Sequence, residues 1–469
     1  MNEEEVIDPS EWEQASTKKM IHYSFGFLLV YLMGRQFNTY VFYYYEVELG
    51  LPVALLGLAF VIFAIWNMIN DPLIGYLTDR PFRWTQKWGW RFPWIVVATI
   101  PYLICWFLLF APPENLVSQT DPWPIFWYFV IIACLFDTFF SLYSIHLNAG
   151  FTNHFRTDAD RRKSSAINLV VPRILALIIG FTVPLFYIYG DRSSMILAQS
   201  LIIFILIICV LILIPGIRES EDLKESFIRG YESTERASYF KTMKSAFEQK
   251  NFVIALCVFM LLSLAATLAS ASSVYFMKDV LGLPLSYSIY TLLAGFLGFL
   301  LFVPFWSNIV RKIGHVKTMK LSLILITLVY LPTLWITTLL EAIIFAFIGG
   351  FAAGAFWITL GPVTADVNDE NTAITGKHQE GALAGIRTFF FRFALIFQAV
   401  IFTVVHIATG YNPDPQATQT ALAIWGIRIH RGLIPSILSL LAFIIMKKWY
   451  DLEGEKKIAI KQKLRQLGL

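Results

Sequence analysis

Charged residues are scarce in this sequence. They fill only 15% of its 469 positions, whereas a soluble domain carries about 25%. Hydrophobic residues make up 57%, and phenylalanine alone occurs 41 times. This balance excludes the set of soluble domains that the length would otherwise suggest. It is the composition of a membrane protein.

Cysteine is also rare. The four cysteines all lie in apolar runs without CxxC spacing, which excludes a disulfide framework and a zinc site. The net charge of +4 is spread over short loops, so no nucleic-acid partner is expected. Residues 1–19 have no apolar core and no cleavage site, so we expect no removable signal peptide. We expect no resident cofactor or metal.

Long apolar runs are what the sequence has in abundance. A bilayer core of ~30 Å needs a helix of about 20 apolar residues. Twelve runs reach this length: 23–45, 51–77, 93–111, 124–150, 165–189, 195–215, 251–277, 286–310, 318–338, 341–366, 379–410 and 418–446. We predict an all-α membrane protein with twelve transmembrane helices.

The loops between these runs alternate in charge. Basic loops follow the second, fourth and eighth runs, whereas the alternate loops are acidic and include Glu46, Glu48 and Glu114. Because positive loops stay inside, we predict a multi-pass protein of the cell membrane with both termini cytoplasmic.

One long polar stretch divides the chain in two. We predict a cytoplasmic N-terminal segment (1–22), a six-helix bundle (23–215), a cytoplasmic link (216–250), a second six-helix bundle (251–446) and a basic cytoplasmic tail (447–469). Two parallel six-helix repeats are typical of the major facilitator fold, whose solute site lies between the halves near the membrane midplane. The tail is either laid along the inner leaflet or solvated.

Asp71 is an ionisable group inside the apolar run 51–77. A charge there costs roughly 2.5–3.5 kcal/mol, so it usually faces a cavity and has a function. Asn67 lies four residues earlier, hence on the same helix face. The two side chains could offer oxygen ligands to Na⁺, and protonation of Asp71 is an equal alternative. The predicted coupling ion is therefore H⁺ or Na⁺.

Other polar side chains lie deep in apolar runs. The candidate substrate-binding residues are Arg35, Arg173, Arg392, Asp137, Tyr31 and Tyr143. Arginine grips a carboxylate or phosphate through two hydrogen bonds, and the tyrosine rings could stack on a sugar. Internal ion pairs that hold helices together, such as Asp71 with Arg173, remain an alternative. Asp79 and Arg80 follow the Asp71 helix and are the candidate gating residues.

Several motifs resemble one known family. They are Tyr43-Tyr44-Tyr45, Asn70-Asp71-Pro72, Trp88-Gly89-x-Arg91-x-Pro93-Trp94, Pro172-Arg173, Ala365-Asp366, Gly376-Lys377, Phe391-Arg392, Gly426-Ile427-Arg428 and Pro435. Together they resemble the glycoside–pentoside–hexuronide:cation symporters, typified by the melibiose permease. That family shares its fold with the lysophosphatidylcholine transporters of animals.

The resemblance implies a role for individual residues. Asp71 resembles the second of two cation-binding acids, Arg173 an arginine of the sugar site, and Arg392 a lysine that links the two sites. Asn67 replaces the first cation-binding acid. Tyr31 stands where sugar-binding members carry an acid. These departures shift the expected substrate from a neutral sugar towards an anionic solute.

The sequence therefore predicts a secondary transporter that works by alternating access. We expect cation-coupled symport of a sugar, glycoside or uronate-like anion by a monomer, with a small-molecule substrate and membrane lipids as its partners. A lysolipid or amphiphile carrier of the same fold, and a membrane sensor without transport, remain alternatives. No nucleophile–base pair or metal cluster is evident, so we predict no enzyme.

Overall fold

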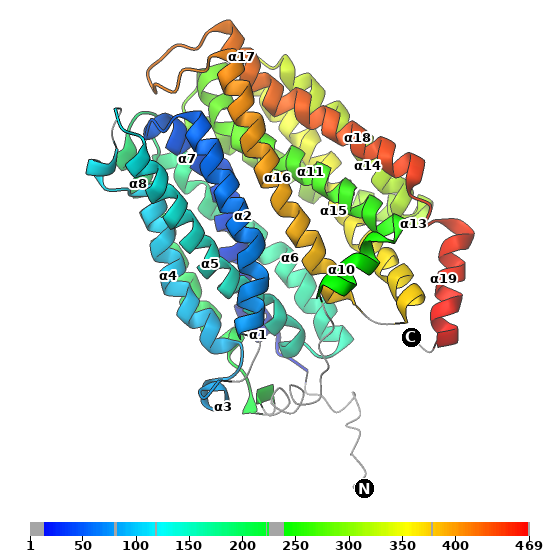
Figure 1. The fold of residues 1–469 in the computed structure, drawn as a ribbon. Helices are drawn as coiled ribbons and strands as arrows, with labels where there is room; N and C mark the ends of the chain where they lie inside the picture. Colours follow the sequence, from blue (N-terminus) through cyan, green and yellow to red (C-terminus); the bar gives the residue numbers. More distant parts are fainter. Residues whose placement is uncertain are drawn as a thin grey trace. The chain divides into compact units, whose positions relative to one another are not determined.

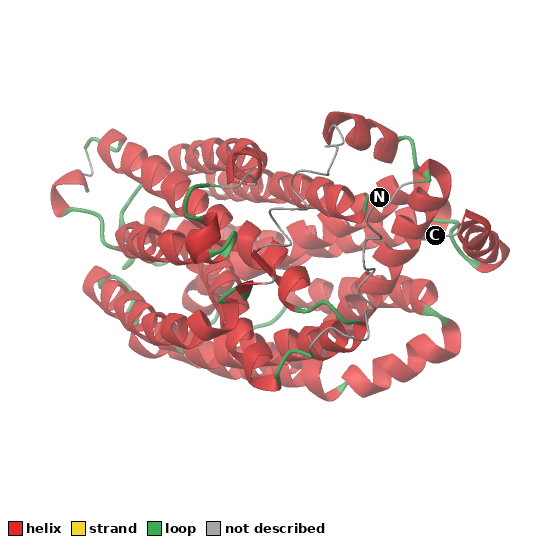
Figure 2. Cartoon of the chain, turned by 90° about the horizontal axis from the view of Figure 1, so that it is seen from below, coloured by secondary structure: helices red, strands yellow, loops and turns green. Residues whose placement is uncertain are grey.

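The computed structural model describes residues 14–78, 82–117, 120–221, 223–224, 239–376 and 379–467. Within these ranges the regular structure is entirely helical (Figure 2). Ten helices are long and apolar enough to cross a membrane, and the bent pair Leu285–Leu301 and Val303–Ile313 brings the number to eleven. Each of the eleven coincides with one of the last eleven predicted runs, so the all-α membrane fold is confirmed.

The first predicted run, 23–45, is helical as well. It contains α1 (Thr17–Gln36), followed by the π-helical turns η2 (Phe37–Val41) and η3 (Tyr44–Glu48). This region is not among the eleven spans. Lys18, Lys19 and Arg35 leave α1 only a short uncharged stretch, which explains the difference.

The remaining helices follow in chain order (Figure 1). They are α2 (Val53–Thr78), α3 (Thr85–Trp88), α4 (Phe92–Phe110), α5 (Trp123–His154), α6 (Asp158–Gly180), α7 (Thr182–Phe186), α8 (Arg192–Ile217), α10 (Tyr239–Phe247), α11 (Lys250–Tyr275), α12 (Ser288–Leu301), α13 (Val303–Ile313), α14 (His315–Tyr330), α15 (Leu339–Thr375), α16 (Glu380–Thr409), α17 (Ala421–Arg428), α18 (Ile434–Trp449) and α19 (Gly454–Leu467). Short turns η4 (Glu114–Leu116), η5 (Phe276–Val280), η6 (Leu285–Tyr287), η7 (Leu331–Leu334) and η8 (Ile429–Leu433) connect some of them.

The chain forms two compact units. The first unit contains residues 1–37 and 65–235, and the second contains residues 38–64 and 236–469. The end of the first predicted run and the first half of α2 thus belong to the second unit. Glu46, which the loop pattern suggested was a surface acid, is only 2% exposed within this unit.

The first unit packs α1 against α6 and α8, and α4 against α5. Aromatic rings fill the space between α4 and α5, where Tyr102 stacks on both Phe136 and Tyr143. The buried indole of Trp106 donates a 3.0 Å hydrogen bond to Gln199 on α8. These contacts fix the position of α5 against α4, and α5 carries several of the candidate site residues.

Glu219 caps the N-terminus of α4 in the first unit. Its buried carboxylate accepts hydrogen bonds from the backbone N–H groups of Trp90 (2.6 Å), Arg91 (2.6 Å) and Phe92 (3.1 Å), at the start of α4. This single side chain thus satisfies three backbone donors at the N-terminus of α4. The helix dipole adds to the effect, because it favours a negative charge at that end.

We expect Glu219→Ala to destabilise the protein by about 3 kcal/mol, since hydrogen bonds to a charged group are worth about 1.5–3 kcal/mol and their loss strands buried donors. Chemical unfolding of the purified protein measures the change. Glu221→Ala is the control, because that side chain is 79% exposed and forms a surface ion pair with Lys224. It should cost less than about 1 kcal/mol. Equal losses in the two variants would contradict the role of Glu219.

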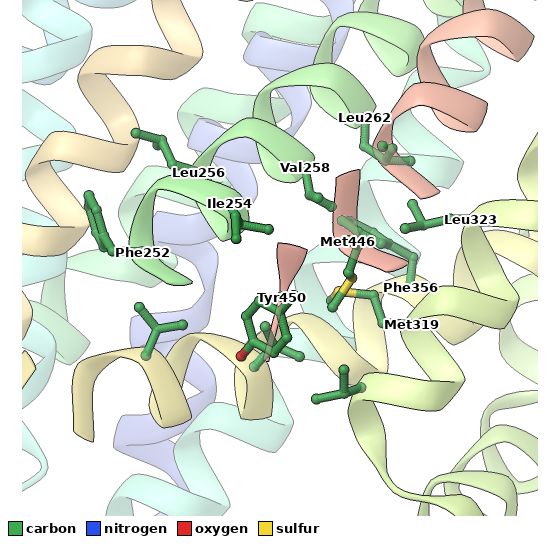
Figure 3. Close-up of a cluster of buried hydrophobic side chains, with 14 of the residues drawn as sticks. Phe252, Ile254, Leu256, Val258, Leu262, Met319, Leu323, Phe356, Met446 and Tyr450 are labelled. Atoms are coloured by element: carbon green, nitrogen blue, oxygen red, sulfur yellow. The ribbon is translucent and has the colours of Figure 1, made fainter. Parts of the chain in front are cut away.

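The second unit is built on α11, α14, α15, α16 and α18. Its apolar core includes Phe252, Val258, Met319, Phe356 and Met446 (Figure 3). The α12–α15 contact is unusually close. A Cβ added to Gly350 would lie 2.8 Å from the backbone nitrogen of Phe299, and one added to Gly298 would lie 2.9 Å from the carbonyl carbon of Phe347. Small residues let these two backbones touch.

The basic tail is structured. Residues 454–467 form α19, which packs on α15. Lys457 binds Asp366 at 2.6 Å, and Lys456 binds Glu370 at 3.0 Å and Asp451 at 2.6 Å. Two of the lysines that suggested a lipid-binding or solvated tail are therefore engaged by carboxylates of the second unit.

Candidate functional site

A buried polar group within the apolar helices joins α2 and α5 in the first unit. Asn67 and Asn70 both donate to the carboxylate of Asp137: Asn67 Nδ2 to one oxygen, and Asn70 Nδ2 to the other at 3.1 Å. Because positions three and four apart share a helix face, Asn67, Asn70 and Asp71 point from the same side of α2. All but Asp71 are at most 2% exposed.

Asp71 meets α5 one turn further along. Its Oδ1 accepts a hydrogen bond from Ser141 Oγ. Asp137 and Ser141 are four residues apart on α5, so they face α2 together, as Asn67 and Asp71 face α5. Two carboxylates are thus held about one helical turn apart between facing helices. We call these five residues the α2–α5 group: Asn67, Asn70, Asp71, Asp137 and Ser141.

One oxygen of the group has no hydrogen-bond donor. The side-chain amide of Asn67 turns its nitrogen to Asp137, and its Oδ1, which is buried, accepts no hydrogen bond within the described part of the chain. A buried acceptor without a donor costs about 1–3 kcal/mol. Carboxylate, amide and hydroxyl oxygens are the ligands that hard cations such as Na⁺ prefer. The residues present therefore fit a small cation, or a proton carried by a carboxylate.

A second pair joins α1 and α6. Arg173 Nε donates to the hydroxyl of Tyr31 at 3.3 Å, and its guanidinium lies 5.3 Å from the centre of that ring. Tyr31 is 44% exposed within the structure. A half-buried guanidinium beside an accessible aromatic ring is suited to an anionic, ring-shaped solute.

The other predicted site residues have varied surroundings. Tyr143 is fully buried, and its hydroxyl donates to the carbonyl of Gly26 at 3.2 Å, so its contacts are those of a packing residue. Arg35 is exposed on α1, one turn beyond Tyr31. Arg392 is half-buried on α16, in the second unit. The candidate gating residues, Asp79 and Arg80, lie outside the described residues.

Sequence reasoning missed three polar residues near these groups. Asn70 and Ser141 belong to the α2–α5 group, and the Asn-Asp-Pro motif at 70–72 was the available signal for the first. The third residue is His146, which is buried inside α5. Its Nε2 lies 2.9 Å from Thr78 Oγ1 at the end of α2, and its ring stacks on Trp94. It forms a second polar contact between α2 and α5.

Comparisons with known proteins agree with this description. The chain matches the family model described as MFS/sugar transport protein over residues 22–454. It is 23% identical to the uncharacterized symporter YnaJ of Bacillus subtilis (strain 168), over 95% of this chain and 94% of that protein. It is 24% identical to the human sodium-dependent lysophosphatidylcholine symporter 1, over 94% of this chain and 84% of that protein.

Solved structures show the same fold at low identity. The nucleoside transporter NupG superposes with a TM-score of 0.62 and 14% identity, covering 92% of this chain and 100% of that chain. The D-xylose–proton symporter superposes with a TM-score of 0.60 and 13% identity, covering 92% and 97%.

The apolar helices and the buried polar group between α2 and α5 are those of a multi-pass membrane transporter. The chain belongs to the MFS/sugar transport protein family. The family match covers most of the chain and confirms the prediction of a major facilitator transporter rather than an enzyme.

Proposed function

We propose that this protein is a cation-coupled symporter of a sugar, glycoside or uronate-like anion, of the melibiose permease-like group. The α2–α5 group is the observation that carries the proposal. In it, two carboxylates and the buried Oδ1 of Asn67 lie within about one helical turn of one another between α2 and α5. The relative named as a sodium-dependent symporter supports ion coupling. The coupling ion is H⁺ or Na⁺.

In this proposal Asp71, Asn67 and Asp137 bind or exchange the coupling ion. Asp137 was first assigned to the substrate, but its contacts with Asn67 and Asn70 favour the ion. Arg173 and Tyr31 orient the solute, with Arg35 and Arg392 as further candidates for its anionic end. Asp79 and Arg80 remain the proposed gate. We also propose, from the sequence, the boundaries of the two bundles, a monomeric state, a location in the cell membrane and cytoplasmic termini.

Thermal-shift measurements on the purified protein test the proposal. Sugars, uronates and lysolipids are each added with and without Na⁺ at two pH values. We expect a uronate or glycoside to stabilise the protein, and more strongly with the coupling ion, because ligands that bind only the folded state raise the unfolding temperature. Stabilisation by lysolipids alone would contradict this choice of substrate.

Arg173→Gln is expected to raise the half-saturation concentration for an anionic solute about 10-fold to 100-fold, since it removes a charge-assisted interaction of about 1.5–3 kcal/mol. Uptake by proteoliposomes measures this. Tyr31→Phe is the matched variant, because it removes only the hydroxyl that accepts from Arg173. It should change half-saturation less than 10-fold, or about 1 kcal/mol. An equal effect of Arg173→Gln on a neutral sugar would show that the arginine does not read charge.

A pocket in the second unit supports a second candidate, an amphiphile carrier. This pocket is partly open and apolar, with an empty volume of about 630 Å³ that includes its open side. It is lined by side chains of α11, α14, α15, α16 and α18, among them Phe252, Val258 and Met446. Its polar lining includes Arg387, which donates to Thr364 at 3.0 Å. An acyl chain with an anionic head fits such a lining. The lysolipid arm of the thermal-shift experiment decides between the two candidates.

A further inference from the structure

Five buried polar side chains of the second unit form a connected row that the proposed symport does not use. We call it the Glu46 cluster: Glu46, Ser272, Tyr275, His406 and His430. None is more than 2% exposed. Glu46 lies in η3 and His430 in η8, and both are π-helical turns. Such turns are rare and occur frequently at functional sites.

Hydrogen bonds connect the row from end to end. The carboxylate of Glu46 accepts from the hydroxyl of Tyr275 at 2.5 Å, and its other oxygen lies 2.8 Å from Nδ1 of His406. The Nε2 atoms of His406 and His430 are 3.3 Å apart. Nδ1 of His430 lies 2.6 Å from Ser272 Oγ, which in turn lies 2.6 Å from the carbonyl oxygen of Leu268.

The hydrogens in this row can be counted. Beyond the hydroxyl of Tyr275, four contacts each need one hydrogen: Glu46–His406, His406–His430, His430–Ser272 and Ser272–Leu268. Two neutral imidazoles and one hydroxyl supply only three hydrogens. One additional proton, on an imidazole or on the carboxyl, completes all four bonds.

Packing fixes the geometry on which this count depends. The ring of His430 stacks on Phe402 with centroids 4.2 Å apart, and the ring of His406 stacks on Tyr411 at 4.4 Å. Tilting either ring would break these stacking contacts, and a 180° flip that keeps them would put a carbon atom where a nitrogen now lies. The nitrogens therefore stay aligned along the row. The missing hydrogen cannot be supplied by reorienting an imidazole.

Other titratable and charged groups lie around the cluster, and they are Tyr43, Lys278, Asp279, Tyr330, Tyr411 and Arg431. Asp279 is bound to Lys278 at 3.2 Å and to the hydroxyl of Tyr411 at 2.9 Å, so that pair is neutral. Arg431 follows His430 in the chain, and its guanidinium lies over the ring of Phe276 at 4.2 Å. Glu46 is the acidic member of the cluster, so we place the additional proton in its 2.8 Å contact with Nδ1 of His406.

The cluster also joins two parts of the second unit. Glu46 belongs to residues 38–64, whereas the other members belong to α11, α16 and η8. Two further contacts tie the same segment: Thr39 Oγ1 to Ser270 Oγ at 2.8 Å, and Thr403 Oγ1 to the carbonyl of Val53 at 3.2 Å. The hydrogen bonds of Glu46 are thus the ionisable part of this attachment.

We propose that the Glu46 cluster is a binding site for one proton, and that this proton fastens residues 38–64 to α11 and α16. Loss of the proton leaves one hydrogen bond unmade and the Glu46 carboxylate uncompensated in a buried site, which weakens the attachment. The site is built from residues other than the α2–α5 group, and it would exist whichever ion drives transport.

Glu46→Gln tests the proposal because the glutamine amide carries the missing hydrogen permanently. Its NH₂ can donate to Nδ1 of His406, its oxygen can accept from Tyr275, and all four bonds are then complete without a titrating proton. The matched control is Glu48→Gln, which removes the same charge from the same turn but is not a member of the cluster.

Hydrogen–deuterium exchange of the full-length protein in detergent measures the attachment. For peptides within 38–64, the rate of wild type is divided by that of each variant at the same pH, so intrinsic exchange rates cancel. We expect the wild-type to Glu46→Gln ratio to be near one below the ordinary histidine pKa of about 6.5, because both the attached and the detached states then hold the proton. The ratio should rise by up to about tenfold per pH unit from there to the pH at which the attached site releases its proton, and level off above that pH. Glu48→Gln should follow wild type throughout.

A wild-type to Glu46→Gln ratio that stays constant with pH would overturn the proposal. Should Glu46→Gln not fold, ¹⁵N-histidine NMR of the wild-type protein decides instead. We expect one imidazole signal, or a strongly hydrogen-bonded imidazole pair, to keep its extra proton above about pH 6.5. If both imidazoles were neutral above that pH, and infrared spectroscopy showed an ionised Glu46 carboxylate, the cluster would not bind the proposed proton.

Discussion

Asp71→Asn is expected to abolish cation-driven accumulation of the solute, lowering it about 100-fold or more, while the protein stays folded. The substitution keeps the size of the side chain and its ability to accept from Ser141, but it removes the charge that binds a cation or carries a proton. A lost charged ligand of about 3 kcal/mol corresponds to a factor of about 100. Gradient-driven uptake by proteoliposomes measures accumulation.

Two further variants make this result specific. Asp137→Asn should have a comparable effect, because it disturbs the carboxylate that Asn67 and Asn70 hold in place. Asp414→Asn, in an exposed loop, is the control and should match wild type. Exchange of solute without a gradient should survive in Asp71→Asn. Accumulation within twofold of wild type in both Asp71→Asn and Asp137→Asn would refute the assignment of the α2–α5 group.

Gly350→Ala is expected to destabilise the protein by about 2 kcal/mol or more, although alanine favours a helix by about 1 kcal/mol over glycine. The added Cβ would lie 2.8 Å from the backbone nitrogen of Phe299 and closer still to the carbonyl oxygen of Gly295. Backbone atoms cannot rotate away, so α12 and α15 must separate. The apparent unfolding temperature and the monodisperse fraction after extraction measure the loss.

The same helix provides the control. Gly349 also lies on α15, but the nearest atom to a Cβ added there, apart from its own helix, is the side-chain Cγ1 of Val329 at 3.4 Å, an ordinary contact distance. Gly349→Ala should therefore leave stability unchanged or raise it by up to about 1 kcal/mol. If both alanine variants behaved alike, the close α12–α15 approach would have no energetic importance.

The helical spans could be predicted from the sequence because hydropathy over about 20 residues is a local property. Each of the eleven apolar spans falls on a predicted run. Asp71 and Asn67 could be predicted as site residues equally well, since a carboxylate and an amide one turn apart are conspicuous in an apolar run. Asp137 stood out in the same way. Its contact with Asn67 and the part played by Ser141 did not, because they depend on how α5 packs against α2.

The Glu46 cluster lay beyond sequence reasoning for a different reason. Glu46 lies at the end of an apolar run, where an acidic residue normally marks a loop. The charge pattern of the loops therefore assigned it to an exposed loop. His406 and His430 lie in separate helices far along the chain. Only tertiary structure brings these groups within hydrogen-bonding distance, so no spacing rule would have linked them.

The pairing of α19 with α15 bears on how the chain is made. Synthesis proceeds from the N-terminus, and domains generally begin to fold in that order. Asp366 and Glu370 therefore leave the ribosome well before Lys456 and Lys457, the cations that neutralise them. His315 and Asn251, which also contact these acids, are made earlier. Until α19 emerges, however, the nascent second unit lacks both lysine partners, so its packing should be completed only near the end of translation.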